Sequence, residues 1–145
     1  MNESMRIGKA GEYRVMSELL CRGFLPSLMP EISEADIILS NGEKIQVKSA
    51  HEKIDGSYNF SFKGWKREVD GNRKQKKHKL KNIDFIVLWA INISDFIIIP
   101  VEIIRKRNSY ITINYRPERK RKSNLQDIFQ KYKNNWNLLN SEEVI

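Results

Sequence analysis

The chain has little cysteine, and it has no long hydrophobic run. Its only cysteine, Cys21, excludes an internal disulfide framework and fits a reducing compartment. The longest apolar run, residues 85–91, is far too short to span a bilayer, and the first residues have no apolar centre of the kind found in signal peptides. We therefore expect a soluble, cytoplasmic protein that has no membrane partner.

Acidic residues are also scarce beside basic ones: 18 Asp and Glu against 26 Lys and Arg, a formal charge of +8. The excess is confined to residues 61–122, which carry 17 basic and 6 acidic residues, while 1–60 has a balance of −2 and 123–145 of −1. It gathers in two basic segments, 63–81 and 116–122. A solvated basic face is one explanation, but the asymmetry favours a phosphate backbone as partner. The expected phosphate contacts are Arg73, Lys74, Lys76, Lys77, Arg119, Lys120 and Arg121.

The 145 residues, of which 40% are hydrophobic and 10% aromatic, suffice for one domain, 1–145, with its own core. We expect a first helix capped by Ser4 that runs to about Arg22 and ends at Gly23. The residues expected on its buried stripe are Val15, Met16, Leu19 and Leu20. No internal repeat interrupts the pattern.

Further along the chain, short apolar and alternating runs predict strands. They cover residues 58–62, 85–91, 96–100 and 110–115, after a short extended piece at 24–30, and 85–91 is the candidate for the central strand. Segment 63–81 is expected to be a basic loop with a short helical part. Ser123 and Gln126 form a capping box for a C-terminal helix, with Leu125, Ile128, Phe129, Tyr132 and Trp136 on one face. These elements predict an α/β fold with a mixed sheet of four to five strands.

Residues 36–48 predict a β-hairpin around Asn41-Gly42. A two-residue loop would place Asp36 opposite Val47 and leave both faces mixed. A three-residue loop, with Gly42 left-handed, places Asp36 opposite Gln46 and puts Lys48 on the same face. The other face then holds only Ile37, Leu39, Ile45 and Val47, so burial favours the three-residue loop.

Glu12 is a second candidate acid, because its spacing to Val15, Met16 and Leu19 places it along the apolar face of the first helix. An acid near the helix start also favours the helix dipole, which is the structural alternative. Glu31 and Glu34 are rival acids in a loop, and a lone His51 at a strand end is more often a surface residue than a base.

Asp36 followed by Gln46-Val47-Lys48 resembles the PD-(D/E)xK nuclease superfamily. Ala35-Asp36 stands where the family usually has Pro-Asp, and Gln46 stands where it usually has Glu. The glutamine form occurs in the branch that contains group I intron-encoded homing endonucleases. Gly8-Lys9-Ala10-Gly11-Glu12 and the segments 82–85 and 98–101 are also similar to this family, so the resemblance runs in pieces from Gly8 to Val101.

The resemblance implies a restriction-endonuclease-like fold, with a mixed central β-sheet flanked by α-helices. It implies a Mg²⁺-dependent DNA endonuclease of homing or restriction type, in which Mn²⁺ substitutes for Mg²⁺. The implied catalytic residues are Glu12, Asp36, Gln46 and Lys48, and the implied metal ligands are Asp36, Gln46, the Val47 carbonyl and Glu12. Because duplex cleavage usually needs two sites, a homodimer or higher homo-oligomer is expected.

Three other functions remain open. A structure-specific nuclease, such as a Holliday junction resolvase, would use the same site. A catalytically inactive nucleic-acid-binding module would explain the charge lost at Gln46. A basic RNA-binding domain without any site would leave Asp36, Gln46 and Lys48 apart.

Overall fold

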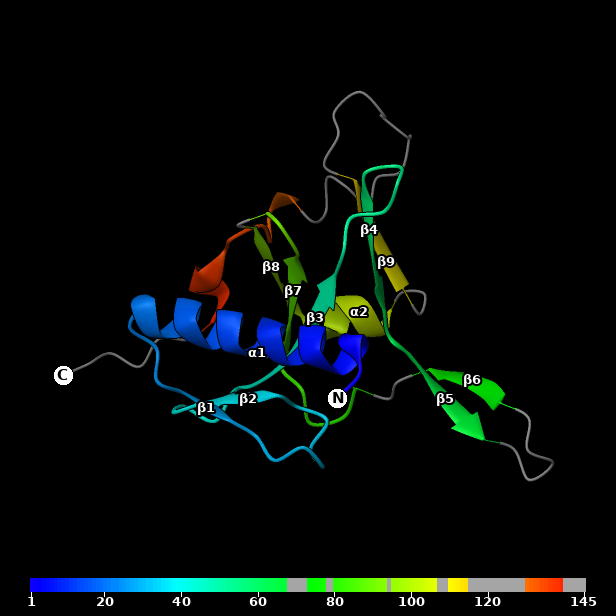
Figure 1. Cartoon of the computed structure of the whole chain (residues 1–145). Helices are drawn as coiled ribbons and strands as arrows, with labels where there is room; N and C mark the ends of the chain where they lie inside the picture. Colours follow the sequence, from blue (N-terminus) through cyan, green and yellow to red (C-terminus); the bar gives the residue numbers. More distant parts are fainter. Residues whose placement is uncertain (68–72, 78–79, 94, 107–109, 115–129, 140–145) are drawn as a thin grey trace.

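A computed structural model of the chain describes residues 1–67, 73–77, 80–93, 95–106, 110–114 and 130–139 (Figure 1). A long helix lies across one face of a mixed β-sheet, and two strands with a short helix lie on the other side (Figure 1). No helix in these ranges is long and apolar enough to cross a membrane.

The long helix α1 spans Glu3–Cys21. Its N-cap is Asn2, whose side chain accepts a hydrogen bond from the backbone N–H of Met5 at 2.9 Å. The prediction of Ser4 as the cap is therefore wrong, because Asn2 supplies the acceptor two residues earlier. Gly23 follows the helix with φ +91°, as expected for its left-handed end position.

The predicted buried stripe of α1 is correct in its centre and wrong at its end. Val15 and Leu19 are fully buried, whereas Leu20 is 56% exposed. Each residue of a helix advances by about 100°, so Leu20, next to Leu19, lies on the edge of the apolar face.

The sheet has five strands in the order β1-β2-β3-β7-β8, which confirms the predicted mixed architecture. The strands are β1 Pro26–Leu28, β2 Ile37–Leu39, β3 Lys44–Ala50, β7 Phe85–Ala90 and β8 Phe96–Pro100. β3 and β7 are parallel, and the other neighbours are antiparallel. The middle position belongs to β3, and β7, the expected central strand, lies beside it between β3 and β8.

Both faces of β7 and β8 are buried, and their side chains alternate between two cores. On the α1 side, Val87 and Ile98 pack with Val15 and Leu19. On the other side the sheet packs against a ladder of β4 Ser57–Ser61 and β9 Tyr110–Asn114, and against the short helix α2 Val101–Arg105. The sheet is thus the middle layer, which explains the continuously apolar sequence of β7.

The first basic segment is a hairpin of β5 Lys63–Arg67 and β6 Arg73–Lys77, paired antiparallel and pointing away from the body (Figure 1). The prediction of a loop with a short helical part is wrong here. Lysine and arginine at most positions of these strands hide the apolar alternation on which strand prediction depends. The second basic segment, 116–122, lies outside the described residues.

The C-terminal helix is not confirmed. Residues 123–129 lie outside the described ranges. Gln130 is helical, and turns and a 3₁₀ helix, η1 Trp136–Leu138, follow it. Tyr132 packs in the core on the β4 side, whereas Trp136 packs in the core on the α1 side. The predicted single helical face therefore does not hold, and both rings are buried within the chain.

Candidate active site

The hairpin of β2 and β3 has the three-residue loop. Ile37 pairs with Ile45 and Ile38 with Lys44, so the same register carries Asp36, just before β2, to the position opposite Gln46. Gly42 has φ +92°, and its N–H donates to the Leu39 carbonyl at 2.9 Å. Only a residue that tolerates positive φ fits this turn.

Burial explains the register, as the sequence predicted. Ile37, Leu39 and Ile45 are buried in the core under α1, and Val47 packs against the same core. Alternation along β3 then sends Gln46 and Lys48 to the opposite face. A shift by one residue would exchange the buried isoleucines for these polar side chains.

The carboxylate of Asp36 is half-buried beside β3, where its Oδ2 accepts the backbone N–H of Val47 at 2.7 Å. The pKa of Asp36 is raised to about 6, mainly by burial and also by the Glu12 carboxyl within hydrogen-bonding reach, while the Val47 N–H and Lys48 oppose the rise. Two acids from distant parts of the sequence thus meet at one point.

Glu12 reaches this point from α1 because the helix lies close to the sheet. A Cβ atom on Gly11 would come within 2.0 Å of Ser49 Oγ and 3.3 Å of the Trp89 ring. Glycine at this position therefore permits the approach. The Glu12 side chain is 16% exposed, and Lys9 Nζ lies 3.2 Å from its Oε2.

Gln46 is 8% exposed, and it is held by one hydrogen bond from its Nε2 to the Glu34 carbonyl at 3.3 Å. Its Oε1 is buried without a hydrogen-bond partner among the described residues. A buried oxygen without a partner costs free energy, on the order of 1–3 kcal/mol. The fold therefore fixes the amide and leaves its oxygen free for another ligand.

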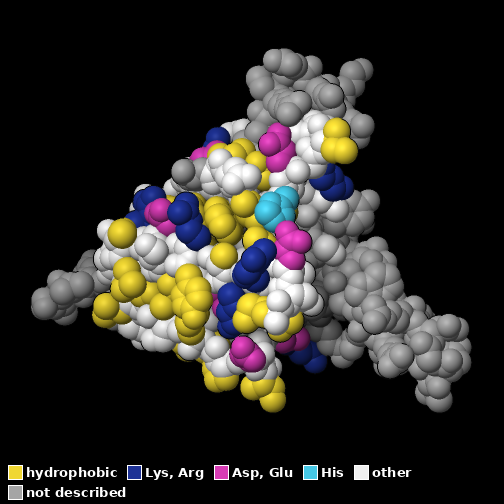
Figure 2. Space-filling view, viewed as in Figure 1, with side chains coloured by type: hydrophobic (Ala, Val, Ile, Leu, Met, Phe, Trp, Pro, Cys, Tyr) yellow, Lys and Arg dark blue, Asp and Glu magenta, His cyan; other side chains and the backbone are white. Residues whose placement is uncertain are grey.

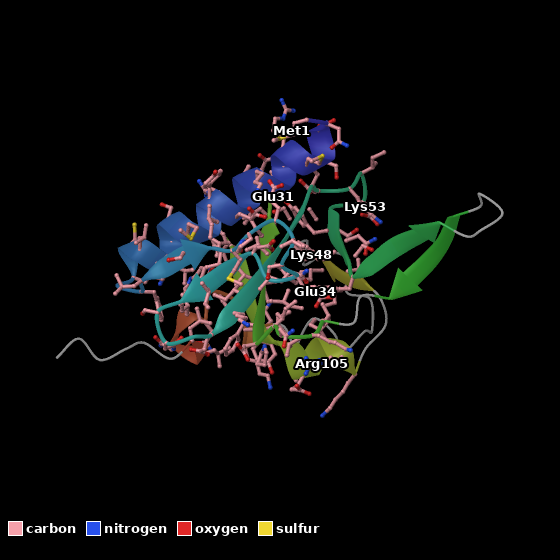
Figure 3. The ribbon with its side chains drawn as sticks, turned by 90° about the horizontal axis from the view of Figure 1, so that it is seen from below. Met1, Glu31, Glu34, Lys48, Lys53 and Arg105 are labelled. Atoms are coloured by element: carbon pink, nitrogen blue, oxygen red, sulfur yellow. The ribbon has the colours of Figure 1, made fainter. Side chains whose placement is uncertain are left out.

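Lys48 lies in the same region and is half-buried. Burial lowers the pKa of Lys48, and the Asp36 carboxylate opposes the change. Its Nζ lies 6.0 Å from the centre of the Phe62 ring. Seen from below in Figure 3, Lys48 lies in the middle of the molecule, between Glu31 on the α1 side and Glu34.

Two open clefts border the N-terminal half of α1. The first, of about 300 Å³, is lined by Glu12, Asp36, Lys9 and Glu31 among others. The second, of about 560 Å³, is lined by Lys48, Val47, Ser49 and the exposed His51, and by the start of the helix. The acids and the amine are therefore accessible from outside, although each is partly buried.

The structure brings together Glu12, Asp36, Gln46 and Lys48, and it leaves the rival acids Glu31 and Glu34 exposed. Arg73, Lys74, Lys76 and Lys77 lie on β6, while Arg119, Lys120 and Arg121 lie outside the described residues. Sequence reasoning missed Lys9 and Phe62. Lys9 could have been found from its spacing, because residues three apart on a helix, such as Lys9 and Glu12, are neighbours.

The oxygens gathered here are of the kind that hard divalent cations take as ligands. No group of three His, Cys, Asp or Glu side chains suited to a metal occurs among the described residues. Two adjacent carboxylates nevertheless offer ligand oxygens, and the hairpin register places Gln46, with its unpartnered Oε1, opposite Asp36. The residues present thus fit a divalent cation, with an amide in the place of a third acid.

Comparisons with known proteins show the fold and the family. The fold is similar to that of a bacterial homing endonuclease, I-Ssp6803I, with a TM-score of 0.79 and 19% identity over 94% of this chain and 93% of that chain. No curated protein sequence shows a significant match to the chain. The family model of PD-(D/E)XK endonucleases matches residues 2–135. With almost the whole chain matched, this protein belongs to the PD-(D/E)XK endonuclease family.

Proposed function

We propose that this nuclease is a Mg²⁺-dependent endonuclease that cleaves duplex DNA, of the homing or restriction type. The observation that carries the proposal is that two carboxylates and a half-buried amine meet, with an unpartnered amide oxygen opposite Asp36 in the hairpin register. The similarity in fold to a homing endonuclease supports the same assignment. Hydrolysis of a phosphodiester needs an activated water and stabilisation of developing negative charge, and these groups are suited to both.

Asp36, Glu12, Gln46 Oε1 and the Val47 carbonyl are the proposed ligands of the cation. When bound, Mg²⁺ would polarise the phosphate and lower the pKa of a water. The chain positions its ligands beforehand: the Val47 N–H fixes Asp36 at 2.7 Å, and the Glu34 carbonyl fixes the Gln46 amide at 3.3 Å. Mn²⁺ also prefers oxygen ligands, so we expect it to substitute.

Lys48 is the proposed partner of the attacking water. Its lowered pKa increases the fraction of neutral amine, which is the form that accepts a proton. In the charged form the same amine stabilises the negative charge that develops on the phosphate. The Phe62 ring, 6.0 Å from Nζ, attracts the charged form of the amine.

The β5–β6 hairpin is the proposed DNA-binding element. Its register places Lys63 opposite Lys77, Lys66 opposite Lys74, and Arg67 opposite Arg73. Like charges directly opposite each other destabilise an isolated hairpin, and a bound phosphate backbone would reverse that effect. Arg73, Lys74, Lys76 and Lys77 are therefore proposed phosphate contacts, and Arg119, Lys120 and Arg121 remain predictions from the sequence.

Oligomerisation follows from the reaction proposed. Each chain has one set of site residues, which can cleave one DNA strand. A duplex has two strands, so a homodimer or higher homo-oligomer is proposed. Sedimentation with and without DNA tests this, and a monomer under both conditions would contradict it.

The decisive experiment is cleavage of a plasmid and of a branched DNA in Mg²⁺ and in Mn²⁺. We expect Asp36→Ala and Lys48→Ala each to lose cleavage by roughly two orders of magnitude or more while DNA binding persists. Glu18→Gln is the matched control, because Glu18 pairs with Arg22 at 3.5 Å on the far part of α1. A wild type that cuts neither substrate with either ion would instead favour an inactive binding module, and preference for branched DNA would favour a junction-resolving enzyme.

A further inference from the structure

Two glycines of α1, Gly8 and Gly11, have opposite surroundings. A Cβ atom on Gly11 would meet Ser49 Oγ at 2.0 Å, so packing explains that glycine. A Cβ atom on Gly8 would have no neighbour within 4 Å, and Gly8 is exposed in the interior of a 19-residue helix. Glycine lowers the stability of a helix interior relative to alanine. The folded chain therefore gives a reason for Gly11 and none for Gly8.

The position of Gly8 suggests a reason outside the chain. Of the described residues that line the two clefts, Gly8 is the one they share. On one side lie Glu12 and Asp36, and on the other lie Lys48 and His51. A ligand that contacts the carboxylates and extends past the helix into the second cleft would pass Gly8. Gly8 itself is exposed, and Figure 2 shows acidic and basic side chains interspersed with hydrophobic ones on the face seen in Figure 1.

We propose that the sugar–phosphate backbone of the cleaved strand crosses α1 at Gly8, and that the missing side chain lets the strand reach the site. This inference rests on the proposed function and adds a substrate-contacting residue to it. The smallest side chain would add a methyl group between the helix and the strand. Misplacement of a reacting group by about 1 Å can cost on the order of a hundredfold in rate.

The proposal predicts that stability and activity change in opposite directions. Gly8→Ala should raise the melting temperature by about 3 °C, because alanine favours the helix and meets no neighbour. The same substitution should lower the single-turnover cleavage rate by at least about tenfold, and Gly8→Leu should lower it further. A purely structural role for Gly8 would lower the melting temperature instead.

Ser17→Leu is the matched control, since Ser17 is exposed on the same helix and lines neither cleft. We expect it to leave both cleavage and DNA binding unchanged. Single-turnover cleavage rates and DNA dissociation constants are measured separately. A variant that binds DNA normally but cleaves it slowly would then indicate a misplaced strand.

A second measurement tests proximity directly. In a Cys21→Ser background, which removes the free exposed thiol, Gly8→Cys should react with duplex DNA that carries bromoacetyl groups on backbone phosphorothioates. Ser17→Cys should react at least about tenfold more slowly, because the effective concentration of the reagent there is lower.

The outcomes separate the two proposals. If the wild type cleaves DNA and Gly8→Leu cleaves equally fast, the route over Gly8 is wrong while the nuclease site stands. If Gly8→Cys and Ser17→Cys react at equal rates, the route is also wrong. If the wild type does not cleave, the proposed function fails, and the inference fails with it.

Discussion

Asp36→Asn should stabilise the metal-free protein at neutral pH, although it removes a residue of the proposed site. Burial raises the Asp36 pKa from 3.8 to about 6, so the ionised carboxylate is unfavourable in the folded chain. A pKa unit corresponds to about 1.4 kcal/mol, which sets an upper limit of about 3 kcal/mol on this penalty. Because Asp36 is only half-buried, water screens part of it, and we expect a gain of about 1–2 kcal/mol.

The sign of the pH dependence follows from the direction of the shift. A raised pKa means that the folded chain holds the Asp36 proton more tightly than the unfolded chain does. The penalty is therefore absent well below pH 3.8, grows as the pH rises toward about 6, and is complete above it. Asparagine has no such titration and keeps an oxygen that can accept the Val47 N–H, so the advantage of the variant should grow over the same interval.

Urea unfolding in EDTA, from about pH 5 to about pH 8, measures this difference. Saturating Mg²⁺ should stabilise the wild type and leave Asp36→Asn almost unchanged, because only the wild type has the carboxylate. Glu18→Gln controls for the loss of a carboxylate elsewhere on the chain. The reasoning is refuted if Asp36→Asn is less stable than the wild type at pH 8, or if the difference between them does not depend on pH.

Two further predictions concern the framework and the hairpin. Gly11→Ala should destabilise the fold by about 1–2 kcal/mol, because the added Cβ overlaps Ser49 Oγ. In thermal unfolding, adding Ser49→Ala should restore most of that stability, since the Ser49 hydroxyl is buried and has no hydrogen-bond partner among the described residues. No recovery in the double variant would show that another contact limits the approach. Replacing Lys74 and Lys76 by alanine should weaken binding of all DNA sequences alike and reduce the slope of log affinity against log salt by about two. An unchanged slope would mean that the hairpin does not contact phosphates.

The site hairpin could be derived from sequence because its alternatives are few. Only two loop lengths were compatible with Asn41-Gly42, and one of them left both faces mixed. The structure has the other. Glu12 was also predicted from sequence: its spacing to Val15 and Leu19 placed it along the apolar face of the helix, and the resemblance of residues 8–12 to the nuclease family implied a place in the site.

Long-range contacts and charged strands could not be derived in this way. The bond from Gln46 to the Glu34 carbonyl depends on how a loop folds over the sheet. The strands β5 and β6 were missed because their lysines and arginines give no apolar alternation. Tyr132 and Trp136 are four residues apart, as on a helix, yet they pack on opposite faces of the sheet, a result that only tertiary structure decides.

Gln46, the departure from the usual family pattern, has a physical explanation in the position of Glu12. Glu12 already approaches Asp36 closely enough to raise its pKa, so a third carboxylate in this buried place would add repulsion. As a proposed ligand, glutamine would supply an oxygen without a charge. Gln46→Glu should therefore lower the stability of the protein in EDTA by about 1–3 kcal/mol, because it places a buried acid beside two others. The substitution also removes the amide that donates to the Glu34 carbonyl.

Mg²⁺ should reverse most of that loss, because a divalent cation neutralises the added charge and the new carboxylate binds it more tightly. Thermal unfolding of the wild type and of Gln46→Glu, in EDTA and across a Mg²⁺ titration, measures both effects. Gln46→Met is the matched control: it is similar in size and has no charge, so it should respond to Mg²⁺ less than the wild type does. Equal stability of Gln46→Glu and wild type in EDTA would show that Glu12 and Asp36 do not set the charge that this site tolerates.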